Sequence, residues 1–396
     1  MTVLLTHGWC RSSYSVLRGL AKHGVKVVVA DTARIGMCQA SHLAHARGRY
    51  RSPYADPDGF VADIVELCRR HGVGLIIPGH EEGELLVQAR ESGRLPPGVA
   101  LPMTDSASLS LVNDKDRMSR LARGLCLPVA PIVDYRTPAE AQVVTDPDRW
   151  YVARARRGNS SKGVRFSRGG EALASELERM TLDFGLDQER APIVQERVTG
   201  CGWGVSCLYW HGRRIASFTH RRLQEKVATG GTSTLRISTS NPELEADAHH
   251  LLDALQWHGL AMLEFKHDAD SGRHHFIEIN PRLWGSIDLA LSSGVNFSWL
   301  LYLAETRGLD AALEAAKPAR EGVVEKWLLG DIIRRLDLLR RGSLVEALRL
   351  SSGERVDAFD DFKLDDPLVL FGEAFYYLAK GVKTQSMNPL EAGMVR

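Results

Sequence analysis

Two strand-like runs in the second half of the chain carry side chains that could hold a divalent cation. LAMLEFKHD contains Glu264, and HHFIEIN contains Glu278 and Asn280. The turn DADSG joins the runs, which predicts a β-hairpin. Alternate side chains of a strand share a face, so Glu278 and Asn280 point the same way, while Glu264 lies on the partner strand. Two carboxylates and an amide suit Mg²⁺, which completes its shell with water and substrate phosphates. The alternative is a polar strand edge that faces solvent.

A glycine-flanked loop in the middle of the chain is a second candidate. GNSSKG spans 158–163 and offers backbone N–H groups, two hydroxyls and the Lys162 ammonium. All of these groups can bind phosphate, so the loop indicates an anion site. The alternative is an ordinary polar turn.

The segment LEFKHDADSGRHHFIEINPRLWGS resembles the metal-binding signature of the ATP-grasp superfamily, a glutamate on one strand and ExNPR on the next. The chain looks most like the carboxylate-amine ligase branch of that superfamily, and the resemblance extends over roughly residues 105–305. Further segments match in family order: NDKDRMSRLA (113–122), like the helix with the first nucleotide-contacting lysine; YVARARRGNSSKGV (151–164), like the lid strand and phosphate loop; IVQERVTG (193–200), like the hinge that cradles adenine; and HRRLQEKVATGGTSTLR (220–236), like the segment facing the γ-phosphate and acceptor.

The resemblance assigns roles to particular residues. It implies nucleotide contacts from Lys115, Arg154, Gly158, Ser160, Ser161, Lys162, Gly163, Gln195, Glu196 and Val198. It implies that Glu264, Glu278 and Asn280 bind Mg²⁺, with Mn²⁺ as an alternative, and that Arg282, Arg222 and Lys226 act in catalysis.

The three catalytic candidates are basic. Arg282 lies two residues past Asn280 and faces the metal side if the extended backbone continues, which Pro281 favours because it disfavours helix at the residue before it. Arg221, Arg222 and Lys226 are candidates to bind a carboxylate-bearing substrate or an acyl phosphate, since this segment faces the cleft in the resembling family. The alternative for these three residues is an exposed basic turn.

The chain departs from the family pattern in two places. Where the family usually has a lysine on the lid strand, the sequence VARA places Arg154, which keeps the charge on a longer, planar fork. The hinge is followed by GCGWGVS rather than by the acidic residue often found near the ribose. We therefore expect no ribose contact there.

The resemblance implies an ATP-dependent carboxylate-amine ligase that forms an amide or peptide bond. The acid would attack the γ-phosphate to give an acyl phosphate, an amine would displace phosphate from it, and ADP would be released. A kinase or an ester-forming ligase on the same scaffold is the alternative enzyme, because the residues do not show the acceptor. A non-catalytic nucleotide-binding protein is the alternative from a different class.

The elements that must position these residues follow from hydrophobic patterning. Strand-like runs at 3–6, 25–31 and 73–79 alternate with helical stretches at 13–23 and 58–71, which predicts a parallel α/β sheet. Its first turn, THGWCRSS, lacks the three glycines of a dinucleotide site, so dinucleotide binding is disfavoured.

From residue 150 onward, short β-branched and aromatic runs with glycine turns predict antiparallel α+β structure, and the chain becomes helical after Gly285. We predict a Rossmann-like pre-ATP-grasp α/β domain at 1–105, an ATP-grasp domain at 106–320 with a lid at about 125–190, and a helical C-terminal extension at 321–396.

Composition limits the kinds of partner. The 396 residues include 50 Lys and Arg against 49 Asp and Glu, which provides no global field for nucleic acid or an anionic membrane. Six scattered cysteines without a CxxC pair are typical of buried thiols in a reducing compartment. We therefore expect a cytoplasmic protein that binds ATP, a small carboxylic acid and an amino-acid-like amine, with a homodimer as a candidate assembly.

Overall fold

The computed structural model describes residues 1–158, 163–225, 232–269, 271–348 and 355–384. By their internal contacts, these residues form two compact units. The first unit comprises Met1–Ser106, Val205–Met262 and the described part of Pro281–Pro389. The second unit comprises Ala107–Gly204 and the described part of Leu263–Asn280.

The first unit begins with alternating strands and helices. They are β1 (Thr2–Leu5), α1 (Arg11–Ala21), β2 (Val27–Asp31), α2 (Met37–Ala40), β3 (Ala46–Arg49), α3 (Pro57–His71), β4 (Val73–Ile77) and α4 (Glu82–Glu91). The strands form a four-stranded sheet in the order β3-β2-β1-β4. Every neighbouring pair is parallel, which confirms the predicted parallel sheet.

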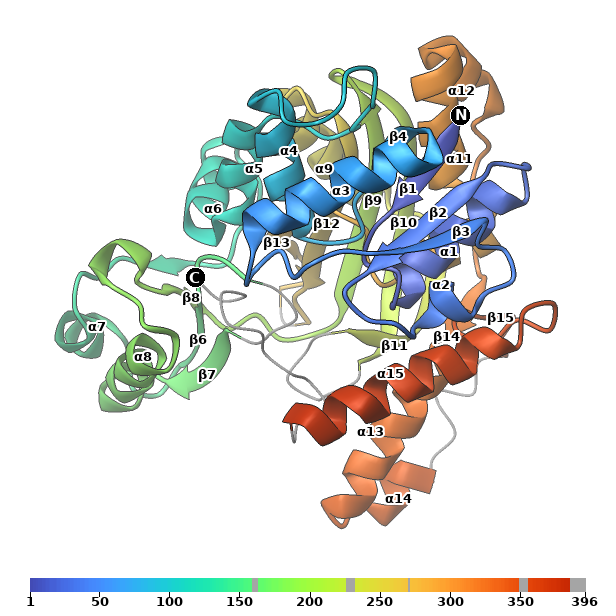
Figure 1. Cartoon of the computed structure of the whole chain (residues 1–396). Coiled ribbons are helices and arrows are strands. Elements are labelled where there is room, and N and C mark those ends of the chain that lie inside the picture. Colours follow the sequence, from blue (N-terminus) through green and yellow to red (C-terminus); the bar gives the residue numbers. More distant parts are fainter. Residues whose placement is uncertain (159–162, 226–231, 270, 349–354, 385–396) are drawn as a thin grey trace. The chain divides into compact units, whose positions relative to one another are not determined.

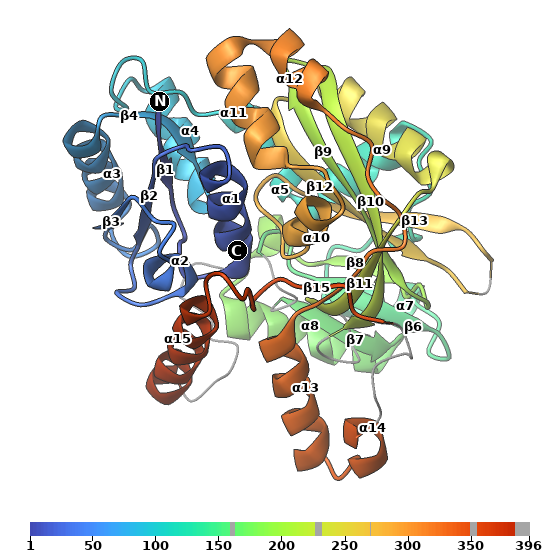
Figure 2. The same cartoon turned by 90° about the vertical axis from the view of Figure 1, so that its right-hand side faces the viewer.

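Local sequence explains these elements. β2 reads VVVAD and is buried throughout, as β-branched residues in a covered parallel strand should be. The Asp56 carboxylate caps α3 by accepting a hydrogen bond from Gly59 N–H, and Pro57 occupies the first turn. Gly72 ends the helix with φ of 58°, a left-handed conformation that favours glycine. Figure 2 shows α1 and α3 on opposite faces of the sheet.

A second sheet has seven strands in the order β13-β12-β9-β10-β11-β14-β15. They are β9 (Gly202–Trp210), β10 (Arg213–Glu225), β11 (Ser233–Thr239), β12 (Gly259–His267), β13 (His274–Asn280), β14 (Val324–Lys326) and β15 (Ala358–Phe359). The associated helices are α9 (Pro242–Ala254), α10 (Ile287–Ser292), α11 (Phe297–Arg307) and α12 (Leu309–Ala315). The pairs of β10 with β11 and of β11 with β14 are antiparallel, as expected for the region after residue 150.

The C-terminal helices α13 (Leu328–Arg340), α14 (Leu344–Leu348) and α15 (Leu368–Thr384) belong to the first unit. α15 packs against α2, and Figures 1 and 2 show the two helices side by side. The Trp9 and Tyr376 rings stack with their centroids 4.1 Å apart. The chain thus returns to its own N-terminal sheet. Among the described helices, none is long and apolar enough to cross a membrane.

A buried network of ion pairs links the N-terminal helix α1 to strand β11 and to C-terminal residues. The Arg236 guanidinium on β11 is fully buried and donates to Glu325 Oε2 at 2.8 Å and to Asp360 Oδ2. Asp360 Oδ2 also accepts from Arg11 Nη1 at 2.9 Å. A buried charge without a partner is costly, so the packing of residue 360 on residue 11 requires both arginines and both carboxylates.

The second unit contains a smaller sheet in the order β5-β8-β6-β7. Its elements are α5 (Ser106–Asn113), α6 (Lys115–Gly124), β5 (Ile132–Val133), α7 (Pro138–Val144), β6 (Trp150–Arg154), β7 (Val164–Arg168), α8 (Glu171–Phe184), a 3₁₀ turn (Gln188–Arg190) and β8 (Ile193–Glu196). Leu173, Leu177 and Met180 of α8 share a core with Tyr151 and Val194 of the sheet. β6, β7 and β8 pair antiparallel, so this unit shows the α+β character that the sequence predicts.

Candidate functional site

The proposed metal ligands lie on two neighbouring strands of the larger sheet. Glu264 lies on β12, and Glu278 and Asn280 lie on β13 (Figure 1). Asn280 Nδ2 donates to Glu264 Oε1 at 3.2 Å, so these two side chains meet. Glu278 precedes Asn280 by two residues and shares its face of the strand. The structure therefore brings the three oxygen-bearing side chains to one side of the hairpin.

Arg154 reaches this cluster from the end of β6. Its Nη2 donates to Glu278 Oε2 at 2.6 Å, and its Nη1 donates to the Ile277 carbonyl at 3.1 Å and to Gln195 Oε1 at 3.4 Å. The residue is only 6% exposed. The planar fork serves acceptors on both β13 and β8, which the single ammonium of a lysine could not do with the same geometry.

Lys115 approaches the same carboxylate from the start of α6. Asp114 caps this helix by accepting hydrogen bonds from the Asp116 and Arg117 N–H groups. Lys115 Nζ donates to the Gly158 carbonyl at 2.6 Å and lies 3.9 Å from Glu278 Oε2. Its side chain is 12% exposed, unlike a lysine that projects into solvent. Two cations from separate elements thus converge on one carboxylate.

The arms of the glycine-flanked loop are anchored to α5 and α6. Gly158 has φ of 117°, which few other residues adopt, and the Gly163 carbonyl accepts from Ala155 N–H at 2.8 Å. Arg156 forms a fork with the Asp114 carboxylate, at 3.0 and 2.7 Å. Arg157 Nη2 donates to the Ser110 hydroxyl at 2.6 Å. The predicted phosphate contacts of Ser160, Ser161 and Lys162 lie outside the described residues.

The predicted adenine hinge lies at the end of β8. Gln195 pairs with Val152 in the sheet, and its Nε2 donates to the Ala130 carbonyl at 3.4 Å. Glu196 N–H donates to the Pro131 carbonyl at 2.9 Å, and its carboxylate pairs with Arg149 at 3.1 Å. A nucleotide that uses this segment must therefore bond to groups other than the Glu196 N–H.

Val198 follows β8 by two residues, outside any strand. A residue in that position keeps its backbone groups out of the sheet ladder, which is compatible with a contact to a ligand edge. Its nucleotide contact stays a prediction.

The donor set suits a hard cation only in part. Within the described ranges, no group of three or more His, Cys, Asp and Glu side chains is placed to hold a metal ion. Two carboxylates and one amide oxygen are too few for Mg²⁺ alone, but they fit an ion that takes its other ligands from water and phosphate. The charges of the two carboxylates and of the two cations Lys115 and Arg154 cancel. A bound Mg²⁺ would add two positive charges, which anions such as phosphates would neutralise.

The three catalytic candidates belong to the first unit. Arg282 Nη1 donates to the Leu283 carbonyl at 3.1 Å, a local contact. Arg222 lies opposite Arg236 on the paired strand, with Nη1 3.6 Å from Glu225 Oε1. Lys226 lies outside the described residues. The roles of all three stay predictions.

Sequence reasoning missed the contacts that organise this cluster. It placed Arg154 on a phosphate and Glu278 on a metal, whereas the structure pairs the two side chains directly. It also missed the fork between Asp114 and Arg156. The sequence features that could have indicated this fork are the helix-capping segment NDKD and, about forty residues later, the adjacent arginines 156 and 157.

Comparisons with known proteins concern the fold and the family of the chain. A family model described as ATP-grasp in the biosynthetic pathway with Ter operon matches residues 188–328. A pyruvate carboxylase of Pichia angusta is 27% identical over 263 residues, which cover 61% of this chain and 21% of that protein. The chain thus spans about a fifth of the length of the curated relatives it matches.

Solved structures show the same fold. The biotin carboxylase domain of a 2-oxoglutarate carboxylase from Hydrogenobacter thermophilus, in complex with MgADP, ADP and bicarbonate, has a TM-score of 0.63 and 16% identity and covers 82% of this chain and 73% of that one. An L-amino acid ligase from Bacillus licheniformis has a TM-score of 0.59 and 15% identity, covering 82% and 78%. The predicted ATP-grasp fold is confirmed by these structures, and residues 188–328 match an ATP-grasp family model.

Proposed function

We propose that this protein is an ATP-dependent carboxylate-amine ligase that forms an amide through an acyl phosphate. The observation that carries the proposal is the cluster in the second unit, where Glu264, Glu278 and Asn280 share one side of a hairpin with Arg154 and Lys115 beside them. Hard oxygen ligands and cations beside one another are what a triphosphate and its metal require.

In the first step, a carboxylate oxygen of the acid attacks the γ-phosphorus of ATP, and the bond to the bridging oxygen breaks to release ADP. A free carboxylate is a poor electrophile, and the mixed anhydride supplies a leaving group. The transferring phosphoryl group needs positioning and charge neutralisation more than covalent help from the protein. Lys115 would neutralise phosphate oxygens directly, and Arg154 would hold Glu278 in place.

In the second step, the amine nitrogen attacks the acyl carbon, inorganic phosphate departs and the nitrogen loses a proton. Water competes with the amine for the same carbon, so the site must exclude it. The small sheet with α7 and α8 is the segment that forms the lid in the resembling family, and we assign it this task. Arg222, Lys226 and Arg282 remain the candidates for holding the acyl phosphate and the substrate carboxylate.

A divalent cation at Glu264, Glu278 and Asn280 would neutralise charge on the β- and γ-phosphates when it is bound. The chain's own part is to orient these ligands. Asn280 donates to Glu264, and Arg154 holds one oxygen of Glu278.

The likeness to carboxylases adds one acid to test. The solved biotin carboxylase domain was obtained with bicarbonate, whose attack on ATP would follow the same first step. A kinase would stop at the phosphorylated acceptor, and an ester-forming ligase would use an alcohol in place of the amine. These alternatives differ in product, so one assay separates them.

The test is ADP release from ATP and Mg²⁺ with a panel of amino acids, other small acids and bicarbonate, each with and without amines. We expect one acid to support ADP release that rises with an amine, with an amide as product. Glu278→Gln should lower the rate on the order of 10²–10³-fold, while the exposed Glu178→Gln on α8 serves as the matched control. A stable phosphorylated product would favour the kinase, and full activity of Glu278→Gln would contradict the metal assignment.

A further inference from the structure

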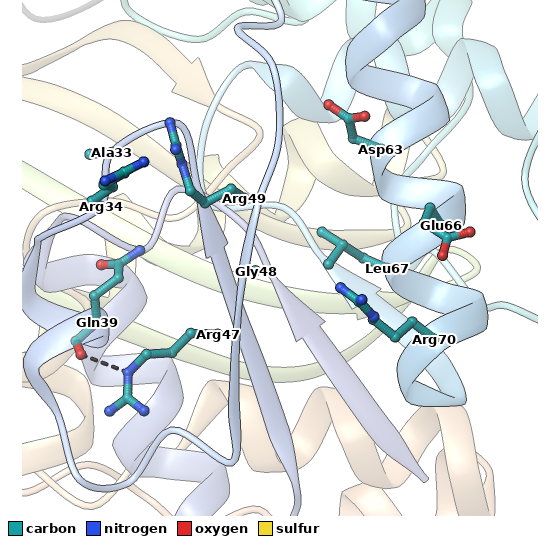
Figure 3. Close-up of a pocket in the computed structure, with 10 residues that line it drawn as sticks. All are labelled: Ala33, Arg34, Gln39, Arg47, Gly48, Arg49, Asp63, Glu66, Leu67 and Arg70. Atoms are coloured by element: carbon teal, nitrogen blue, oxygen red, sulfur yellow. Dashed lines mark hydrogen bonds between the residues drawn. The ribbon is translucent and has the colours of Figure 1, made fainter.

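A pocket of about 490 Å³ lies beside the edge strand of the N-terminal sheet, within the first unit. Its basic residues are Arg34, which follows β2, Arg47 and Arg49 of β3, and Arg70 of α3. We call it the arginine pocket. Figure 3 shows its walls coming from the 33–49 segment and from one face of α3. A cavity of this volume is in the range of small-molecule sites.

The positive charge of the arginine pocket is not neutralised by its own acidic residues. Asp63 lines the pocket, but its carboxylate takes a fork from Arg51 at 3.0 and 2.8 Å. Glu66 pairs with Arg69 at 2.8 Å. Within the described part of the chain, none of the four pocket arginines lies within 4.0 Å of a carboxylate oxygen. The pocket therefore presents four exposed guanidinium groups without a carboxylate partner among the described residues. Arg47 and Arg49 are held by main-chain carbonyls, of Gln39 and Ser41 for Arg47 and of Thr32 for Arg49.

One buried polar group also lines the arginine pocket. The amide nitrogen and oxygen of Gln39 are inaccessible to solvent and have no hydrogen-bond partner among the described residues. Gly8 and Gly36 leave the space that this amide fills, because a Cβ at either position would lie within 3.0 Å of it. The Gln39 carbonyl of the main chain accepts from Arg47 Nε at 2.7 Å, which fixes that arginine at the rim.

We propose that the arginine pocket binds a small molecule with two or more phosphate groups. Guanidinium groups bind phosphate oxygens through paired N–H donors, and four of them exceed what a single phosphate can use. The position on three segments of one α/β layer gives the cations a fixed spacing, which a mobile surface patch lacks. This site is separate from the ATP cluster of the second unit and does not depend on the proposed ligase activity.

The test is titration calorimetry of the full chain with inorganic tripolyphosphate, in the presence of EDTA so that no metal complex forms. We expect Arg47→Gln combined with Arg49→Gln to weaken one binding event about tenfold or more. Arg94→Gln, an exposed arginine paired with Asp58 at 2.7 Å in the same layer, is the matched control and should change affinity less than twofold. The affinity should also fall with added salt, since all four cations are exposed.

A second double variant controls for misfolding of the first one, and hydrogen exchange maps where tripolyphosphate binds. The double variant Arg34→Gln with Arg70→Gln changes no strand residue. It should weaken the same binding event, and it gives a valid reading even if the first double variant disturbs folding. Tripolyphosphate should slow hydrogen exchange across 46–50 and 63–71. Unchanged affinity in both double variants, or protection confined to 107–204, would overturn the proposal. So would tighter binding of a nucleic-acid duplex through the same arginines, which would replace the small molecule with a macromolecule.

Discussion

The contact between Arg154 and Glu278 offers a quantitative test of the candidate site. Arg154 is nearly buried, and it makes one charge-assisted bond at 2.6 Å plus bonds to a carbonyl and an amide oxygen. Glu278 is 23% exposed and keeps Lys115 at 3.9 Å when the arginine is removed. The loss should therefore stay below the 3–5 kcal/mol typical of breaking a fully buried pair.

From these contacts we expect Arg154→Met to lower the free energy of unfolding of the small sheet by about 2.5 kcal/mol. The coupling energy between Arg154 and Glu278 should be about 2 kcal/mol, the value of a hydrogen bond to a charged group in a partly buried setting. Arg154→Lys keeps the charge but loses the fork, so it should recover less than half of the loss.

The assay is a double-mutant cycle with Arg154→Met, Glu278→Gln and the pair. Two compact units need not unfold together, so unfolding in urea should be followed by hydrogen exchange within 150–168 rather than by a whole-chain signal. A coupling energy below about 0.5 kcal/mol would refute the reasoning. So would an Arg154→Lys protein as stable as the parent, because the planar fork would then have no role.

Three further outcomes are expected. Arg236→Met should lower the free energy of unfolding by about 3–5 kcal/mol in urea melts, because it removes the cation paired with buried Glu325 and one of the two cations paired with buried Asp360, whereas the exposed Arg69→Met should cost under about 0.5 kcal/mol. Burial, with neighbouring Asp360, raises the pKa of Asp361 to about 6. The folded state then holds a proton that the unfolded state releases, so stability should fall by about 2 kcal/mol as pH rises from 4 to 6. Asp361→Asn should flatten the dependence of stability on pH over this range. An equal dependence in the variant and the parent would contradict the role of Asp361. Lys115→Met should weaken binding of a non-hydrolysable ATP analogue about tenfold or more by calorimetry, and unchanged affinity would remove this lysine from the nucleotide site.

The elements of the candidate site were predictable because their patterns are local. Alternating residues and a five-residue turn predict the hairpin that carries Glu264 and Asn280, and the segment 113–122 was expected to be helical, as α6 (Lys115–Gly124) is. Strand and helix periodicity also predicts the parallel N-terminal sheet. Each of these inferences uses residues that lie close together in sequence.

The contacts between distant segments were not predictable in the same way. Arg154 and Glu278 are 124 residues apart, and Arg11 and Asp360 are 349 apart, so no spacing rule joins them. The arginine pocket was missed although RGRYR is a visible basic run, because such a run usually forms a solvated edge. Only the packing of α3 beside β3 turns Arg47 into the wall of a cavity.

The most direct test of the ligase proposal follows oxygen atoms. The acid that supports ADP release is prepared with ¹⁸O in its carboxylate and turned over with ATP, Mg²⁺ and its amine. Because the carboxylate oxygen attacks the γ-phosphorus and later leaves with it, we predict one ¹⁸O in each inorganic phosphate by mass spectrometry. Label kept wholly in the organic product, or AMP in place of ADP, would contradict the acyl-phosphate mechanism.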